Sequence, residues 1–127
     1  TCIINALQDK PIPIYGDGRN TREWIHVMDH CIGIIRVMFY GKPGEIYNIG
    51  SGEEANNLDI ANRILKVLNK PEDLIRFTDS KPGHDKRYAL NCYKICSNLN
   101  WSSKYKLDDG IIDTVRWYKD NQALWKN

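Results

Sequence analysis

The chain has 127 residues, of which 42% are hydrophobic and 27% charged, and its formal net charge is +2. These values exclude a disordered chain and a membrane-embedded one, and they argue against a broad basic surface for nucleic acid. A chain of this length can bury roughly two-thirds of its unfolded surface without disulfides. The four cysteines form no CxxC pair and no stretch resembles a signal peptide, so we expect a reducing, cytoplasmic compartment.

The first third of the chain predicts a helix, two strands and a second helix. It opens without an initiator methionine, on an apolar run at 3–7 that indicates a helix already in progress, so we expect a piece of a longer protein. Residues 12–15 predict a short strand, which Pro11 and Pro13 confine to an edge or to an extended segment, and residues 23–27 predict another. Asp29 is the expected N-cap of a helix reaching residue 40. Because apolar residues surround most of that helix axis, we expect burial on more than one side.

The rest of the chain alternates strands and helices. Residues 45–49 predict a strand between two glycine-containing turns, and the next helix runs from 58 to 69. A further strand is predicted at 75–80, a short helix at 92–99, and a last helix from about residue 108. Strands this few and short form an incomplete sheet by themselves. The sequence therefore predicts a mixed α/β unit, without an interdomain linker, that is half of a larger architecture.

Two pairs of residues have a spacing that could place metal ligands on one helical face: His26 with His30, and Cys92 with Cys96. His26 falls in a predicted strand and His30 beyond the expected N-cap, so the two need not share a face. The cysteines occupy the apolar stripe of their helix, where free cysteine commonly serves as a small hydrophobic residue. Neither pair predicts a metal site.

Local signals of dinucleotide binding are missing as well. The turn from Gly16 to Gly18 begins like a glycine-rich phosphate loop, but Thr21 stands where the third glycine belongs, and a strand is predicted after it. None of the seven tyrosines is followed four residues later by lysine. A Tyr-x-x-x-Lys pair therefore cannot form within this chain.

Polar residues beside the predicted turns allow two interpretations. Arg22 can clamp a phosphate with its two-pronged guanidinium, or it can pair with a nearby carboxylate, Asp17 or Glu23. Asn57 can hydrogen-bond a ligand, or it can cap the helix that follows. The residues alone leave both alternatives open.

The loop at 79–91 gathers four basic residues around a Pro-Gly turn, namely Lys81, His84, Lys86 and Arg87. A turn of this kind can hold several donors around one oxygen-rich anion. It can equally be a solvated basic loop that its own aspartates partly neutralise. The two interpretations are evenly supported by the residues.

Three stretches, taken in order, resemble one enzyme family: PIPIYGDGRNTREWIHVMDH at 11–30, GKPGEIYNIGSG at 41–52 and KPGHDKRYALN at 81–91. They resemble the C-terminal portion of the extended short-chain dehydrogenase/reductases that act on nucleotide sugars. The first two stretches are shared widely among epimerases and dehydratases, whereas the third is most similar to the dTDP-glucose 4,6-dehydratases. The resemblance covers nearly the whole chain.

The resemblance implies a two-part enzyme. An N-terminal Rossmann domain, absent from this chain, would bind NAD, and residues 1–127 would form the portion that binds the sugar nucleotide. The implied fold class is α/β, including elements that return to the Rossmann sheet, among them a strand from EIYNIG at 45–50. We expect the parent enzyme to be a homodimer that binds a dTDP-sugar, with no nucleic acid and no membrane among its partners.

The resemblance also assigns substrate-binding positions, which are Pro13, Ile14, Tyr15, Arg22, Asn57, Lys81 and His84. The first three would line the nucleotide, the arginine would meet the diphosphate, and the asparagine would contact the nucleotide. The last two would belong to a phosphate-binding loop. The family usually has arginine at the position of Lys81, and lysine keeps the charge but loses the planar two-pronged donor.

The implied reaction is the NAD-dependent removal of water from dTDP-glucose: oxidation at C4, loss of water across C5 and C6, and return of the hydride at C6. The catalytic residues would lie upstream, so this chain carries none, and the fragment alone is expected to be inactive. One alternative is a UDP-sugar epimerase or decarboxylase of the same superfamily. Another is a stand-alone nucleotide-sugar-binding module, and a small RNA-binding domain is disfavoured because aromatic and basic residues do not interleave on one face.

Overall fold

The computed structural model describes residues 1–80 and 83–126, and it confirms a mixed α/β chain. The α-helices are α1 (Cys2–Leu7), α2 (Val27–Tyr40), α3 (Asn57–Leu68), α4 (Tyr93–Leu99) and α5 (Leu107–Asp120). The strands are β1 (Ile12–Tyr15), β2 (Thr21–Glu23), β3 (Glu54–Asn56), β4 (Ile75–Thr78) and β5 (Arg87–Tyr88). Short 3₁₀ turns cover Glu72–Leu74 and Gln122–Leu124. Within the described residues, no helix has the length and apolar character needed to cross a membrane.

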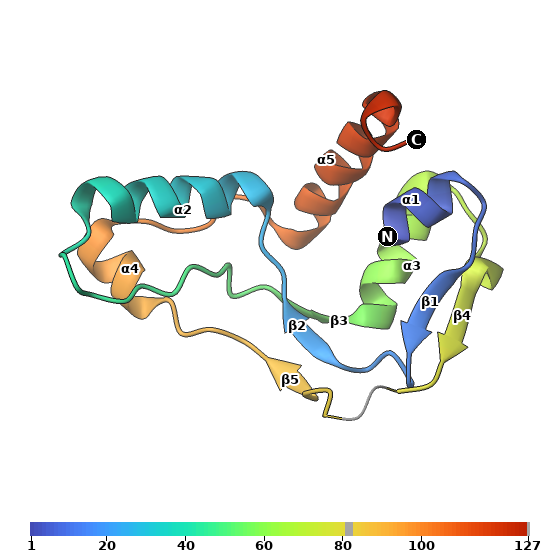
Figure 1. Cartoon of the computed structure of the whole chain (residues 1–127), viewed down its shortest axis with the longest axis horizontal. Helices are drawn as coiled ribbons and strands as arrows, with labels where there is room; N and C mark the ends of the chain where they lie inside the picture. Colours follow the sequence, from blue (N-terminus) through green and yellow to red (C-terminus); the bar gives the residue numbers. More distant parts are fainter. Residues whose placement is uncertain (81–82, 127) are drawn as a thin grey trace.

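The strands form two small sheets. In the first, β1 pairs in parallel with β4, so β1 lies at an edge as its prolines predict. In the second, β2 is the middle strand, antiparallel to β3 and parallel to β5. Figure 1 shows α2 and α4 at one end of an elongated molecule, β1 and β4 at the other, and β2 and β3 between them.

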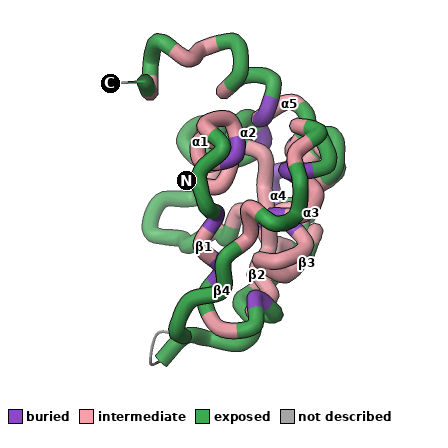
Figure 2. The backbone as a smooth tube through the Cα atoms, turned by 90° about the vertical axis from the view of Figure 1, so that its right-hand side faces the viewer, coloured by how far each residue is buried: buried purple, intermediate pink, exposed green. Residues whose placement is uncertain are grey.

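The larger hydrophobic core lies where α1, α3 and α5 meet the first sheet. Its buried residues are Ala6, Ile12, Ile14, Ala55, Ile60, Ala61, Ile64, Leu65 and Val115. A smaller core of Ile95, Leu99 and Trp101 packs between α4 and α2. Burying one such large side chain contributes about 1.5–3 kcal/mol to stability. Figure 2 shows that the buried positions form only short patches along the chain.

Helix α3 begins one residue earlier than the sequence pattern predicts. The side chain of Asn56, and not that of Asn57, is the N-cap, because it accepts a hydrogen bond from the backbone N–H of Asp59 at 2.7 Å. Asn57 is instead the first helical residue. The interpretation of Asn57 as the cap is therefore wrong.

Helix α2 also begins earlier, at Val27, and its N-cap is His26, whose Nδ1 accepts the N–H of Met28. The expectation of a strand at 23–27 is therefore wrong beyond Glu23, where β2 ends. Asp29 lies in the first turn, only 2% exposed, and its carboxylate accepts two backbone N–H groups from the segment before α5. The side chain that was expected to cap the helix is instead bonded to the backbone of Lys104 and Tyr105, which are far from it in the sequence.

Two further expectations fail within this chain. The apolar residues of α2 are mostly exposed, including Met38 at 67% and Phe39 at 69%, whereas burial on more than one side was expected. Residues 45–49 form no strand, and Ile46 is 81% exposed. Both segments carry the apolar residues of buried elements, yet the described residues supply no second layer to cover them.

Candidate functional site

The Gly-Asp-Gly turn lies against the start of α3. The N–H of Leu58 donates to the carbonyl oxygen of Gly18 at 3.1 Å. Gly18 has a φ of +72°, and a Cβ placed there would approach Cγ2 of Ile14 within 2.6 Å. Packing and the positive φ thus require glycine at this position. The turn lacks the third glycine of a dinucleotide-binding loop, because Thr21 stands there, and strand β2 rather than a helix follows it.

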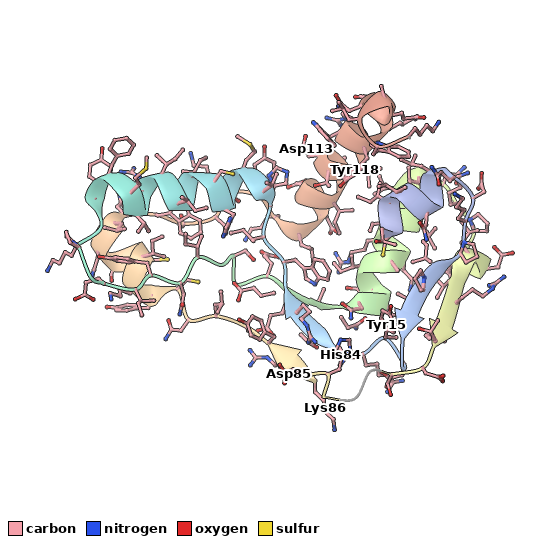
Figure 3. All side chains as sticks on the ribbon, in the orientation of Figure 1. Tyr15, His84, Asp85, Lys86, Asp113 and Tyr118 are labelled. Atoms are coloured by element: carbon pink, nitrogen blue, oxygen red, sulfur yellow. The ribbon has the colours of Figure 1, made fainter. Side chains whose placement is uncertain are left out.

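Two rings from distant parts of the chain meet beside this turn. Tyr15 ends β1, and its ring lies edge-to-face with the ring of His84, with 6.1 Å between centroids and an interplanar angle of 87°. Figure 3 shows both residues together with Asp85 and Lys86, whereas Asp113 and Tyr118 lie apart on α5. The structure thus joins the first and the last stretch to which the family resemblance assigns substrate contacts.

Arg22 lies on the middle strand, half-buried. Its Nη2 donates to the carbonyl oxygen of Asp85 at 2.9 Å, and its Nη1 to that of Thr21 at 2.7 Å. The two carboxylates considered as its partners are engaged elsewhere. Asp17 approaches Arg19, and Glu23 accepts backbone N–H groups at positions 52 and 90. Since carbonyl groups carry no net charge, the positive charge of Arg22 is held in place without being neutralised by these bonds.

The loop after β4 is docked on the segment before and within β2. Asn20 donates its side-chain amide to the carbonyl oxygen of Asp85 at 2.9 Å, the same oxygen that Arg22 contacts. The N–H of Thr21 donates to the carbonyl oxygen of Lys86 at 2.8 Å. The part of the loop that carries His84 is therefore fixed relative to Arg22 by three hydrogen bonds.

Arg87 follows this loop and is paired with Glu54. Its Nε donates to Oε2 at 2.7 Å and its Nη2 to Oε1 at 2.6 Å, a two-pronged ion pair. The hydrogen bonds that Arg87 donates lower the pKa of the Glu54 carboxyl, and their acceptance by Glu54 raises the pKa of Arg87. Sequence reasoning grouped Arg87 with the loop cations and missed its partner, because the two residues are 33 positions apart and only the strand register unites them.

The remaining assigned positions have different environments. Ile14 is 3% exposed and belongs to the larger core, where it supports β1 from within, and Pro13 is half-buried beside it. Asn57 opens α3, and its N–H donates to the carbonyl oxygen of Asn20 at 3.3 Å. Lys81 lies outside the described residues. A continuous series of contacts thus joins Tyr15, His84, Arg22 and the start of α3, and each residue's role toward a substrate stays a prediction.

One member of each pair, His26 and Cys92, contacts neighbouring groups of the fold, whereas His30 and Cys96 are exposed. His26 caps α2 through Nδ1, its Nε2 lies 3.2 Å from Oδ2 of Asp113, and its ring stacks on Tyr105. Burial raises the pKa of the Cys92 thiol, which favours the protonated form. Among residues 1–80 and 83–126, no three or more histidine, cysteine or acidic side chains are grouped so that they could hold a metal ion.

Residues 1–114 match the family described as GDP-mannose 4,6 dehydratase. The chain is 43% identical over 122 residues to a dTDP-glucose 4,6-dehydratase of Streptomyces niveus, an alignment that covers 96% of this chain and 36% of the relative. A dTDP-glucose 4,6-dehydratase from Escherichia coli is 38% identical over 135 residues, covering 98% of this chain and 37% of its own length. The chain thus spans well under half the length of these relatives.

Solved structures give the same result. The crystal structure of dTDP-glucose 4,6-dehydratase from Streptomyces venezuelae, with NAD and a dTDP ligand bound, superposes with a TM-score of 0.93 at 39% identity, covering 98% of this chain and 39% of that one. The UDP-glucuronic acid 4-epimerase from Bacillus cereus gives 0.85 at 31% identity, covering 94% and 38%. The chain therefore belongs to the GDP-mannose 4,6 dehydratase family of extended short-chain dehydrogenase/reductases and matches the C-terminal part of dehydratase structures in that family.

Proposed function

We propose that this chain is the sugar-nucleotide-binding part of an NAD-dependent dTDP-glucose 4,6-dehydratase. One observation carries the proposal: Tyr15, Arg22 and His84 come from three separate segments and lie close together. Tyr15 contacts His84, Arg22 bonds to the neighbouring Asp85, and the Gly-Asp-Gly turn beside them lies against the start of α3. The similarity to dTDP-glucose 4,6-dehydratases along nearly the whole chain supports it.

The proposed contacts follow from the chemistry of each group. Tyr15 and His84 present an aromatic pair against which a nucleotide can pack. Arg22 brings a fixed positive charge and a planar donor toward the diphosphate. Asn57, the first residue of α3, would contact the nucleotide, and Lys81 would add a cation to the phosphate-binding loop. These residues bind and orient the substrate, and binding energy of this kind can be used to hold the sugar against the reacting groups.

NAD would be bound by the part of the parent enzyme that this chain does not include, since the Gly-Asp-Gly turn lacks the third glycine of a dinucleotide-binding loop and is followed by a strand. When bound there, NAD supplies the hydride acceptor and donor of the reaction. The residues in this chain would keep the sugar in register with it. On this proposal the whole enzyme converts dTDP-glucose to the 4-keto-6-deoxy sugar nucleotide, and the fragment alone is inactive.

The exposed face of α2 supports this division into two domains. Large apolar side chains such as Met38 and Phe39 are exposed there, and Ile46 projects from the unpaired segment. Relatives are more than twice as long as this chain. We infer that α2 and residues 45–49 pack against an N-terminal NAD-binding domain, which would bury this apolar surface. The homodimeric parent and the cytoplasmic location remain predictions.

Mass spectrometry of the products tests the proposal. The full-length protein is incubated with NAD and either dTDP-glucose, UDP-glucose or UDP-glucuronate. The proposal expects dTDP-glucose to give a product lighter by one water. A UDP-sugar product of unchanged mass, separable by chromatography, would instead support an epimerase, to which the Bacillus cereus structure is similar. Loss of carbon dioxide from UDP-glucuronate would support a decarboxylase, and tight dTDP binding without turnover would support a binding module.

A further inference from the structure

Strand β5 is only two residues long, although the loop that carries His84 leads directly into it. It pairs with β2 through Thr21 opposite Arg87 and Arg22 opposite Tyr88. Strands in folded proteins usually have three residues or more, so a ladder this short is a weak anchor. The position of the loop therefore also depends on contacts outside the ladder, beginning with the hydrogen bonds from Asn20, Thr21 and Arg22 described above.

The ion pair between Glu54 and Arg87 supplies such a contact. Glu54 lies on β3 and Arg87 on β5, and β2 runs between these two edge strands. The pair therefore crosses the middle strand and ties both edges of the sheet together. Both oxygens of the carboxylate are used, at 2.6 and 2.7 Å, which fixes the guanidinium plane as well as its distance.

The strand register separates this pair from the proposed ligand contacts. Glu54 is opposite Glu23, and Arg87 is opposite Thr21. Because successive side chains in a strand point to opposite faces, Arg22 points to the face opposite that of its two neighbours Thr21 and Glu23. The ion pair thus lies on one face of the small sheet, and the side chain of Arg22 points to the other face.

We propose that Glu54 is a positioning residue for the sugar-nucleotide site: by holding Arg87 it fixes β5 and, through β5, the loop that places His84 beside Tyr15. This inference rests on the proposed function. Arg87 on this view is not a ligand of the diphosphate, although it is part of the basic loop. The lowered pKa of Glu54 is consistent with a carboxylate that stays ionised in this pair.

The test uses the full-length protein and three variants. Glu54→Gln keeps the shape of the side chain but removes its charge, and Arg87→Glu replaces attraction by repulsion. The double variant Glu54→Arg with Arg87→Glu restores an ion pair of reversed direction. Asp9→Asn is the matched control, because it breaks another exposed ion pair, with Lys70, at the far ends of α1 and α3.

We expect Glu54→Gln to raise the KM for dTDP-glucose and the Kd for dTDP by about two- to fivefold, with kcat and the Kd for NAD unchanged. Arg87→Glu should be worse, and the double variant should recover most of the loss. If the double variant stays as weak as Arg87→Glu, Arg87 itself contacts the ligand, and the positioning role is overturned.

Hydrogen exchange in the ligand-free protein separates this inference from the function on which it rests. The N–H of Thr21 bonds to the loop carbonyl of Lys86, so peptides covering 20–23 should exchange faster in Glu54→Gln than in the wild type or in Asp9→Asn. Unchanged exchange together with unchanged dTDP affinity in Glu54→Gln would overturn the role of Glu54 alone. A wild-type protein that binds no dTDP would overturn the proposed function, and with it that role, whatever the exchange shows.

Discussion

Replacement of Asp29 by alanine should destabilise the protein more than its position near a helix start suggests. Asp29 is almost fully buried, and its Oδ2 accepts the backbone N–H groups of Lys104 and Tyr105, each at 2.9 Å. Alanine leaves both donors, whose hydrogen bonds are part-buried, without this partner, and a group that stays unsatisfied costs about 1–3 kcal/mol. Together they cost about 2–6 kcal/mol, which is a large part of the roughly 5–15 kcal/mol that stabilises a typical domain.

The assay is urea denaturation of the full-length protein, with the wild type, Asp29→Ala and Asp29→Asn followed by tryptophan fluorescence. Asp29→Asn retains one acceptor oxygen and should lose less stability than Asp29→Ala. An Asp29→Ala variant with a free energy of unfolding within about 0.5 kcal/mol of the wild type, the range usual for surface substitutions, would refute this account. In that case the two amides must find other partners when the carboxylate is removed.

Three other changes test the site and its support. Arg22→Ala should weaken dTDP binding about ten- to a hundredfold, since hydrogen bonds to charged groups are the stronger ones, and should leave NAD binding unchanged; equal calorimetric dTDP affinities would contradict its assignment. Gly18→Ala combines a φ of +72° with a steric conflict at Ile14, so it should cost about 2–5 kcal/mol in thermal or urea unfolding. The hydrogen bonds from Arg87 lower the pKa of Glu54. The stability that this pair contributes should therefore be fully present above the ordinary carboxyl pKa of 4.5, and it should be lost as the pH falls through the lowered pKa of Glu54. The protection factors of the amides at 20–23, which correct for the pH dependence of intrinsic exchange, should therefore fall only below pH 4.5, and a fall starting near neutrality would contradict this ionisation.

Elements defined by their own periodicity were predicted well. Helix α3 carries a single apolar stripe that matches its buried face, and β1 and β4 are short apolar runs bounded by turn residues. Helix α5 begins one residue before the expected start. For α3, α5 and β1 the local pattern and the tertiary environment agree, because their apolar residues pack against a core that this chain itself supplies, whereas in β4 only Ile75 is partly buried.

Elements defined by a distant partner were predicted poorly. The start of α2 was misplaced because Asp29 is drawn to backbone groups 75 and 76 residues away, which leaves His26 as the cap. The apolar character of α2 and of 45–49 was recognised, but it indicates burial against something that lies outside this chain. A sequence pattern indicates that a segment is apolar enough to be buried, but it does not indicate whether the surface that buries it belongs to the same chain.

The family resemblance indicated which residues could form the candidate site, but not which contacts hold them in place. The family resemblance placed Tyr15, Arg22 and His84 in one site, and the structure brings them together. What sequence could not give is how they are held: Arg22 by the carbonyl group of Asp85, and the loop by the pairing of Arg87 with Glu54. Such contacts depend on strand register and on backbone groups, and neither of these can be recognised from the types of residues in the sequence.

The two parallel pairings have a consequence for how this site can change in evolution. Strands β1 and β4 pair in one sheet and β2 and β5 in the other, so the turn from β1 to β2 and the loop from β4 to β5 are two bridges between the same two sheets. Tyr15 lies at the end of β1 where the first bridge begins, Arg22 lies on the strand that follows this bridge, and His84 lies on the second bridge. An insertion in one bridge would pull against the other, whereas an exchange of side chains would not. Ligand preference at this site is therefore free to diversify by substitution but constrained in loop length.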